Sequence, residues 1–139
     1  MKPTAPTSTS DFQLSWWRQR AIVYFIAAGN PPIAIKIGVT QWQSAKKRIG
    51  ACQTGNHEAL RLIGIHRFIE GDFPLKSAED KERELHHIFR KWQRFPEGTR
   101  GHEWFTASEE LIDYIRSHAD QPTEHGFTTY VSEMTGPKK

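Results

Sequence analysis

The stretch "IAIKIGVT" (33–40) brings together side chains that can hold a phosphate group. If it is a β-strand, Lys36, Gly38 and Thr40 share one face, because side chains alternate along a strand. Lysine and threonine can bind a phosphate by charge and hydroxyl. A glycine inside a strand often marks the close approach of a ligand or another backbone. The alternative is an ordinary polar face turned to solvent.

Other residues capable of the same chemistry flank this strand. Lys46, Lys47 and Arg48 follow it in the segment "QSAKKRIGAC", and a guanidinium here adds a second positive charge for a phosphate. Tyr24 precedes it in "AIVYFIAAG". The alternatives are a solvated basic helix face and an aromatic side chain that packs across a sheet.

Glu82 lies on an otherwise apolar helical stripe. The stripe also contains Ala78, Leu85, Phe89 and Trp92. A carboxylate in such a position must be paired, hydrated or functional, because an unpaired buried charge is costly. His86 lies one turn further on, so the two side chains can share a metal, a water or a proton. Alternatively, Glu82 is favoured by the dipole near a helix start, and His86 is a half-buried imidazole.

The helices and strands that position these residues can be predicted from the apolar pattern and from the turn and cap residues. Two apolar runs around "GNPP" predict a hairpin, and "ALRLIGIHRF" predicts a third strand. Ser44 is expected to cap one helix, Ser77 with Asp80 to start a second, and Thr106 with Glu109 to cap a third that extends through Ile115. The predicted order is β-β-α-β-α-α, a small α/β (α+β) domain.

Composition sets wider limits. The chain has 139 residues, 37% of them hydrophobic, which fits one domain with a real core. Its net charge of +3 permits a nucleic-acid partner without requiring one, and its single cysteine rules out an intrachain disulfide. No apolar run is long enough for a membrane span and no secretory signal is visible, so we expect a soluble, cytoplasmic protein with no membrane partner.

Three segments are expected along the chain. Residues 1–15 form a flexible N-terminal segment, 16–118 the folded domain, and 119–139 a C-terminal tail. Within the tail, Phe127, Tyr130 and Val131 are apolar enough to dock on the domain.

Taken in order, these residues resemble the GIY-YIG nuclease superfamily, in particular its branch of bacteriophage T5 open-reading-frame-172-type DNA-binding domains, also described as the meiotically up-regulated gene 113 type. The likeness spans about two thirds of the chain. It rests on "VYFI", "IKIGVT", Arg48, "CQTG", Glu82-x-x-Leu85-His86-x-x-Phe89 and "EWF".

The resemblance implies a small three-stranded antiparallel sheet, flanked by helices, that carries a metal-dependent site for cleaving phosphodiester bonds. It implies that Tyr24 is the first-motif tyrosine, that Arg48 neutralises phosphate charge, and that Glu82 holds one Mg²⁺ or Mn²⁺, weakly and mainly with DNA present. Lys36 stands where nucleases of this superfamily carry a tyrosine, and the first motif lacks its glycine. His86 is a candidate substitute base.

The sequence therefore predicts a DNA-acting, metal-dependent endonuclease. Its candidate catalytic residues are Tyr24, Lys36, Arg48, Glu82 and His86, and its candidate DNA contacts are Lys36, Gly38, Thr40, Lys46, Lys47 and Arg48. Two alternatives stay open: a non-catalytic DNA-binding module that uses the same cleft, and a protein-interaction domain with a decayed site, although no protein partner can be inferred. A shared site also requires Tyr24 and Lys36 to lie on one sheet face, which needs an even residue sum for directly opposed pairs.

Overall fold

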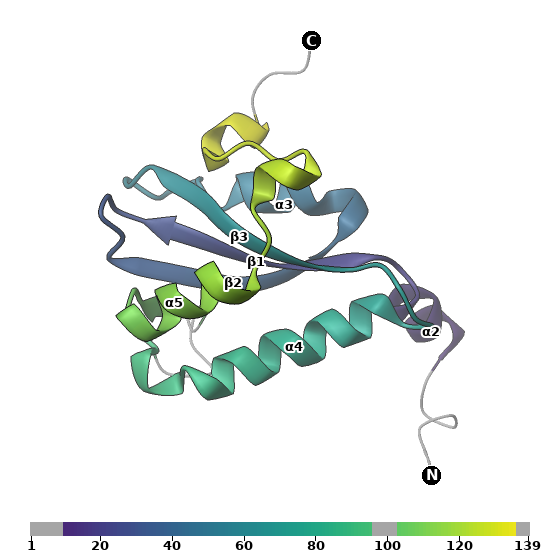
Figure 1. The fold of residues 1–139 in the computed structure, drawn as a ribbon. Coiled ribbons are helices and arrows are strands. Elements are labelled where there is room, and N and C mark those ends of the chain that lie inside the picture. Colours follow the sequence, from purple (N-terminus) through teal and green to yellow (C-terminus); the bar gives the residue numbers. More distant parts are fainter. Residues whose placement is uncertain (1–9, 96–102, 136–139) are drawn as a thin grey trace.

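A four-stranded antiparallel sheet forms the centre of the protein in the computed structural model, which describes residues 10–95 and 103–135. The strands are β1 (Ala21–Ala28), β2 (Ala34–Gln41), β3 (Leu60–Phe68) and β4 (Trp104–Thr106), in the spatial order β3-β1-β2-β4. Helices cover both faces of this sheet (Figure 1). The α+β class expected from the sequence is confirmed.

The central strand β1 separates two hydrophobic cores. Its odd-numbered residues, such as Phe25, pack in one core, and its even-numbered residues, such as Ile22 and Ile26, pack in the other. All three of these side chains are fully buried. A nearly continuous apolar run is the pattern expected of a strand that is covered on both faces.

Helices α4 (Pro74–Ile88) and α5 (Glu109–His118) cover the odd face. Helix α4 starts at Pro74, earlier than the predicted Ser77, because proline suits the first helical turn, where its missing N–H costs nothing. The predicted stripe is confirmed, since Ala78, Leu85 and Phe89 are buried.

Helix α3 (Ala45–Ala51) and the segment that follows α5 cover the even face (Figure 1). Ala45 and Ile49 of α3 are buried against the sheet. In the C-terminal segment, Phe127 and Val131 are buried as well, whereas Tyr130 is 51% exposed. Residues 120–134 thus include side chains of the second core, within the stretch predicted as a tail.

Two further details differ from the sequence prediction. The sheet has four strands instead of three, because the short apolar stretch at Trp104 pairs with residues 34–36 of β2. Ser108, not Thr106, caps α5: its side chain accepts a hydrogen bond from the Leu111 N–H. Three residues are too few for a periodic strand signal.

An additional helix, α2 (Asp11–Trp17), precedes the sheet and overlaps the predicted N-terminal segment; residues 1–9 of that segment lie outside the described residues. Ser10 caps it by accepting a hydrogen bond from the Gln13 N–H. Over residues 10–95 and 103–135, none of the helices combines the length and the apolar content that a membrane span needs.

Candidate functional site

Tyr24 and Lys36 lie on the same face of the β1–β2 hairpin. Tyr24 is directly opposite Gly38, and Ile26 is directly opposite Lys36, so opposed residues have an even sum, as predicted. Tyr24 and Lys36 are therefore diagonal neighbours and not a direct pair. This register places both side chains on the α3 side of the sheet.

Gly38 makes room for Tyr24. A Cβ atom built on Gly38 would overlap the hydroxyl end of the Tyr24 ring. The gap that the sequence assigned to a DNA backbone is therefore filled by a side chain of the protein itself. Tyr24 is only 6% exposed, and burial, followed by the neighbouring Cys52, raises the pKa of its phenol far above the ordinary value. The phenol stays protonated at neutral pH.

Lys36 forms an ion pair with Glu103. Its ammonium nitrogen lies 2.8 Å from a carboxylate oxygen of Glu103, and the two side chains are 20% and 30% exposed. The backbone fixes this arrangement, because the Ile37 N–H donates a hydrogen bond of 3.0 Å to the Glu103 carbonyl. Glu103 directly precedes β4, and its side chain reaches the site from there.

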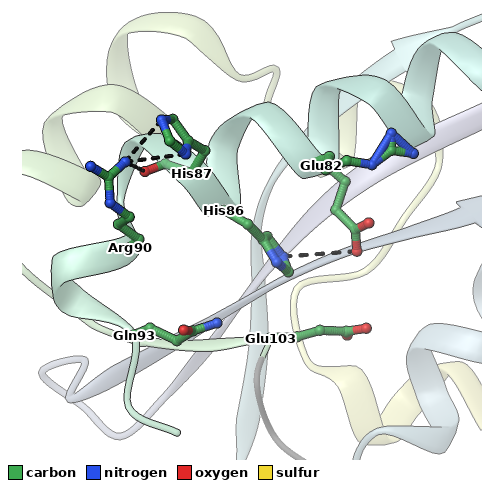
Figure 2. A pocket seen from close by; sticks show the side chains of 7 residues that line it. Glu82, His86, His87, Arg90, Gln93 and Glu103 are labelled. Carbon is green, nitrogen blue, oxygen red and sulfur yellow. Dashed lines mark hydrogen bonds and ion pairs between the residues drawn. The ribbon is translucent and has the colours of Figure 1, made fainter. Parts of the chain in front are cut away.

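Glu82 approaches the same place from α4. Its side chain is 19% exposed. Burial and then the charge of Glu103 raise its pKa to about 7, while Arg83 and, less strongly, Lys36 oppose this rise. Figure 2 shows Glu82 and Glu103 on opposite walls of one pocket, which has a volume of about 310 Å³. Two carboxylates and one ammonium therefore converge at the outer edge of β2.

His86 links α4 to this edge. Its Nε2 atom lies 3.0 Å from the Ile37 carbonyl oxygen, and since a carbonyl only accepts, Nε2 is the donor. The same nitrogen is 3.9 Å from a Glu82 oxygen (Figure 2), and the ring packs edge-on against Phe105. In this arrangement Nε2 carries the proton, and the ring ties α4 to the backbone of β2.

Arg48 lies on the exposed side of α3, one turn before Cys52. Burial raises the pKa of the Cys52 thiol, while Lys36, a hydrogen bond with Tyr24, and Arg48 lower it. Cys52 therefore has Tyr24 as a hydrogen-bond partner and both cations within electrostatic reach. No site role was predicted for Cys52, which lies at helical spacing from Ala45 and Ile49 in the sequence and so fits the apolar face of this helix.

The remaining predicted DNA contacts divide into two groups. Lys46 and Lys47 are exposed on α3, and the ammonium of Lys46 lies 5.9 Å from the centre of the Phe127 ring. Thr40 is 6% exposed, and its hydroxyl donates a hydrogen bond of 3.4 Å to the Gln41 carbonyl. The structure thus leaves the lysines accessible to a ligand and keeps Thr40 away from the pocket.

The donor set at Glu82 fits a hard divalent cation only loosely. Glu82 and Glu103 offer carboxylate oxygens, which Mg²⁺ and Mn²⁺ prefer, but Lys36 already occupies Glu103. Among the described residues, a tight cluster of three potential ligands occurs elsewhere, at Asp120, Glu124 and His125. A cation at Glu82 would therefore need further oxygen ligands, from water or phosphate.

The fold and this pocket define a class: a small α+β domain with a basic and acidic pocket at the edge of an antiparallel sheet. More specifically, the chain belongs to the T5orf172 domain family, whose model matches residues 21–119. The match covers all four strands and the helices α3, α4 and α5. No curated protein and no solved structure matched the chain.

Proposed function

We propose that this protein is a GIY-YIG-like endonuclease that hydrolyses DNA phosphodiester bonds with Mg²⁺ or Mn²⁺. The observation that carries the proposal is the position of Glu82, a largely buried carboxylate beside Lys36 and Glu103 at the edge of β2. Membership of the T5orf172 domain family and the likeness of the sequence to GIY-YIG nucleases support it.

Each residue has a distinct task in this proposal. Lys36 and Arg48 bind the phosphate that is attacked, and their charges stabilise the additional negative charge of the transition state. Tyr24, protonated and hydrogen-bonded with Cys52, orients the polar groups beneath that phosphate. Glu82 would hold the divalent cation, and Glu103 lies close enough to affect its charge. When bound, such a cation polarises the phosphoryl group and stabilises the leaving oxygen.

A second candidate is a DNA-binding module without catalysis. It is favoured by the state of two candidate bases: Tyr24 is held protonated, and Nε2 of His86 donates to a backbone carbonyl. The third possibility, a protein-interaction domain with a decayed site, implies that the charged residues do not converge. It loses support from the electrostatic contact between Lys36, Glu82 and Glu103.

Supercoiled plasmid incubated with Mg²⁺ or Mn²⁺ separates these functions. We expect the wild type to convert it into nicked and linear forms and Glu82→Gln to leave it intact, while duplex affinity stays level or rises because a negative charge next to the phosphate is removed. Glu70→Gln is a matched control, since Glu70 is exposed in the loop after β3. Equal cleavage by Glu82→Gln would show that the metal assignment is wrong. Binding without cleavage by the wild type would establish the non-catalytic module.

A further inference from the structure

Lys36 is not available to a phosphate without a cost. Its ammonium is 2.8 Å from Glu103, and both side chains are mostly shielded from solvent. Any DNA phosphate that binds Lys36 must therefore compete with a carboxylate of the protein itself. Because both side chains keep some contact with solvent, which screens their attraction, the pair can exchange partners.

Removal of Lys36 from this pair leaves an unfavourable arrangement. Glu82 and Glu103 line the same pocket, and the charge of Glu103 disfavours a negative charge on Glu82. Arg83 and Arg90 also line the pocket, but the guanidinium of Arg83 pairs with Asp80, and that of Arg90 bonds to His87. Lys36 is in direct contact with Glu103, whereas Arg83 and, less strongly, Lys36 favour the negative charge on Glu82.

We propose that Glu103 is an exchange residue with two partners. In the free protein it holds Lys36; when DNA binds, Lys36 moves to a phosphate, and Glu103 joins Glu82 as the second carboxylate of the divalent-cation site. This inference rests on the proposed DNA-acting function. The charges balance in both states, since the phosphate takes the ammonium and the divalent cation takes the carboxylates.

The exchange makes the binding of DNA and of the cation interdependent. A cation on Glu82 and Glu103 weakens the hold of Glu103 on Lys36 and so favours phosphate binding, and phosphate binding in turn frees Glu103 for the cation. By thermodynamic linkage, each ligand must raise the affinity for the other by the same factor. A site made from Glu82 alone, with Glu103 as a fixed partner of Lys36, lacks this route of coupling.

Fluorescence anisotropy with a labelled DNA duplex tests the exchange. In EDTA, Glu103→Gln should bind the duplex about three- to five-fold more tightly than the wild type, because Lys36 is released. Glu70→Gln, which removes the same charge from the exposed loop after β3, should show less than half of this gain. With Ca²⁺, which prefers oxygen ligands, wild-type affinity should rise further and that of Glu103→Gln should not.

Three outcomes can be told apart. If Glu103→Gln and the wild type bind DNA equally in EDTA and respond equally to Ca²⁺, the exchange is wrong while the DNA-acting function stands. If the wild type binds no duplex under either condition, the proposed function itself fails. If Glu103→Gln does not fold, as judged by circular dichroism, the wild type alone decides: DNA affinity independent of Ca²⁺ overturns the exchange.

Discussion

The charge state of Glu82 depends strongly on its surroundings. Burial and Glu103 raise its pKa from the ordinary 4.5 to about 7. The folded protein therefore holds a proton on Glu82 more tightly than the unfolded chain does. This contribution to stability is fully present below pH 4.5 and is lost as the pH rises towards 7.

Glu82→Gln should accordingly stabilise the metal-free protein at pH 8, where the wild type carries an unfavourable charge. The expected gain is about 1–3 kcal/mol in the free energy of unfolding, and it should nearly vanish at pH 4.5. Urea unfolding at the two pH values measures it, with Glu70→Gln as the control. If the wild type is as stable as Glu82→Gln at pH 8, burial and Glu103 do not disfavour the charge on Glu82.

The sequence identified most site residues but not what each one contacts. The sequence predicted which side chains of β1 and β2 share a face, because this depends only on the alternation of side chains along a strand. Tyr24 and Lys36 were therefore correctly placed on one face. The gap at Gly38 was read as space for a ligand, and only the three-dimensional contact with Tyr24 shows what fills it. For the same reason, the sequence did not reveal that His86 bonds to the backbone of Ile37.

At the scale of elements, the C-terminal segment is part of the second core. Two short 3₁₀ helices, Pro122–His125 and Val131–Thr135, carry it across the α3 side of the sheet (Figure 1). It also forms isolated β-bridges from Asp120 and Tyr130 to β3. Helices of four and five residues give no amphipathic period in a sequence, which is why this segment was predicted as a tail.

Phe127→Ala should therefore destabilise the protein as a core substitution does. Phe127 is 5% exposed and packs edge-on against Trp42, so we expect a loss of about 3 kcal/mol in the free energy of unfolding. Tyr130→Ala removes an aromatic ring that is 51% exposed in the same segment and should cost about 0.5 kcal/mol. A loss for Phe127→Ala in urea unfolding as small as that expected for Tyr130→Ala would show that the segment does not dock.

Helices and strands with a long apolar pattern were predicted correctly, and short ones were missed. The three longer strands and the three helices that follow β2, β3 and β4 were all expected, because each combines an apolar pattern with turn or cap residues. Strand β4 was missed since it has three residues and owes its pairing to the neighbouring β2. Helix α2 was missed because its neighbourhood reads as a Pro, Thr and Ser-rich terminus.

For the whole molecule, DNA binding should depend on salt. A surface that uses Lys36, Lys46, Lys47 and Arg48 neutralises a few phosphates, which predicts a log–log slope of about −3 to −4 between affinity and salt concentration. Arg48→Ala should reduce the slope by about one, whereas Arg116→Ala, on the exposed side of α5, should leave it unchanged. Anisotropy titrations over a range of NaCl concentrations measure both. Binding that is insensitive to salt would contradict a nucleic-acid function.

The edge of the sheet at β4 also bears on the dynamics of the protein. Ile37 is bound there on both backbone groups, its N–H by the Glu103 carbonyl and its C=O by His86. Local opening of this edge would separate Glu103 from Lys36 without unfolding the central strands. The amide proton of Ile37 should thus exchange with solvent deuterium faster than the amide protons of β1. Its protection factor would report how often this edge of the sheet opens in the native state.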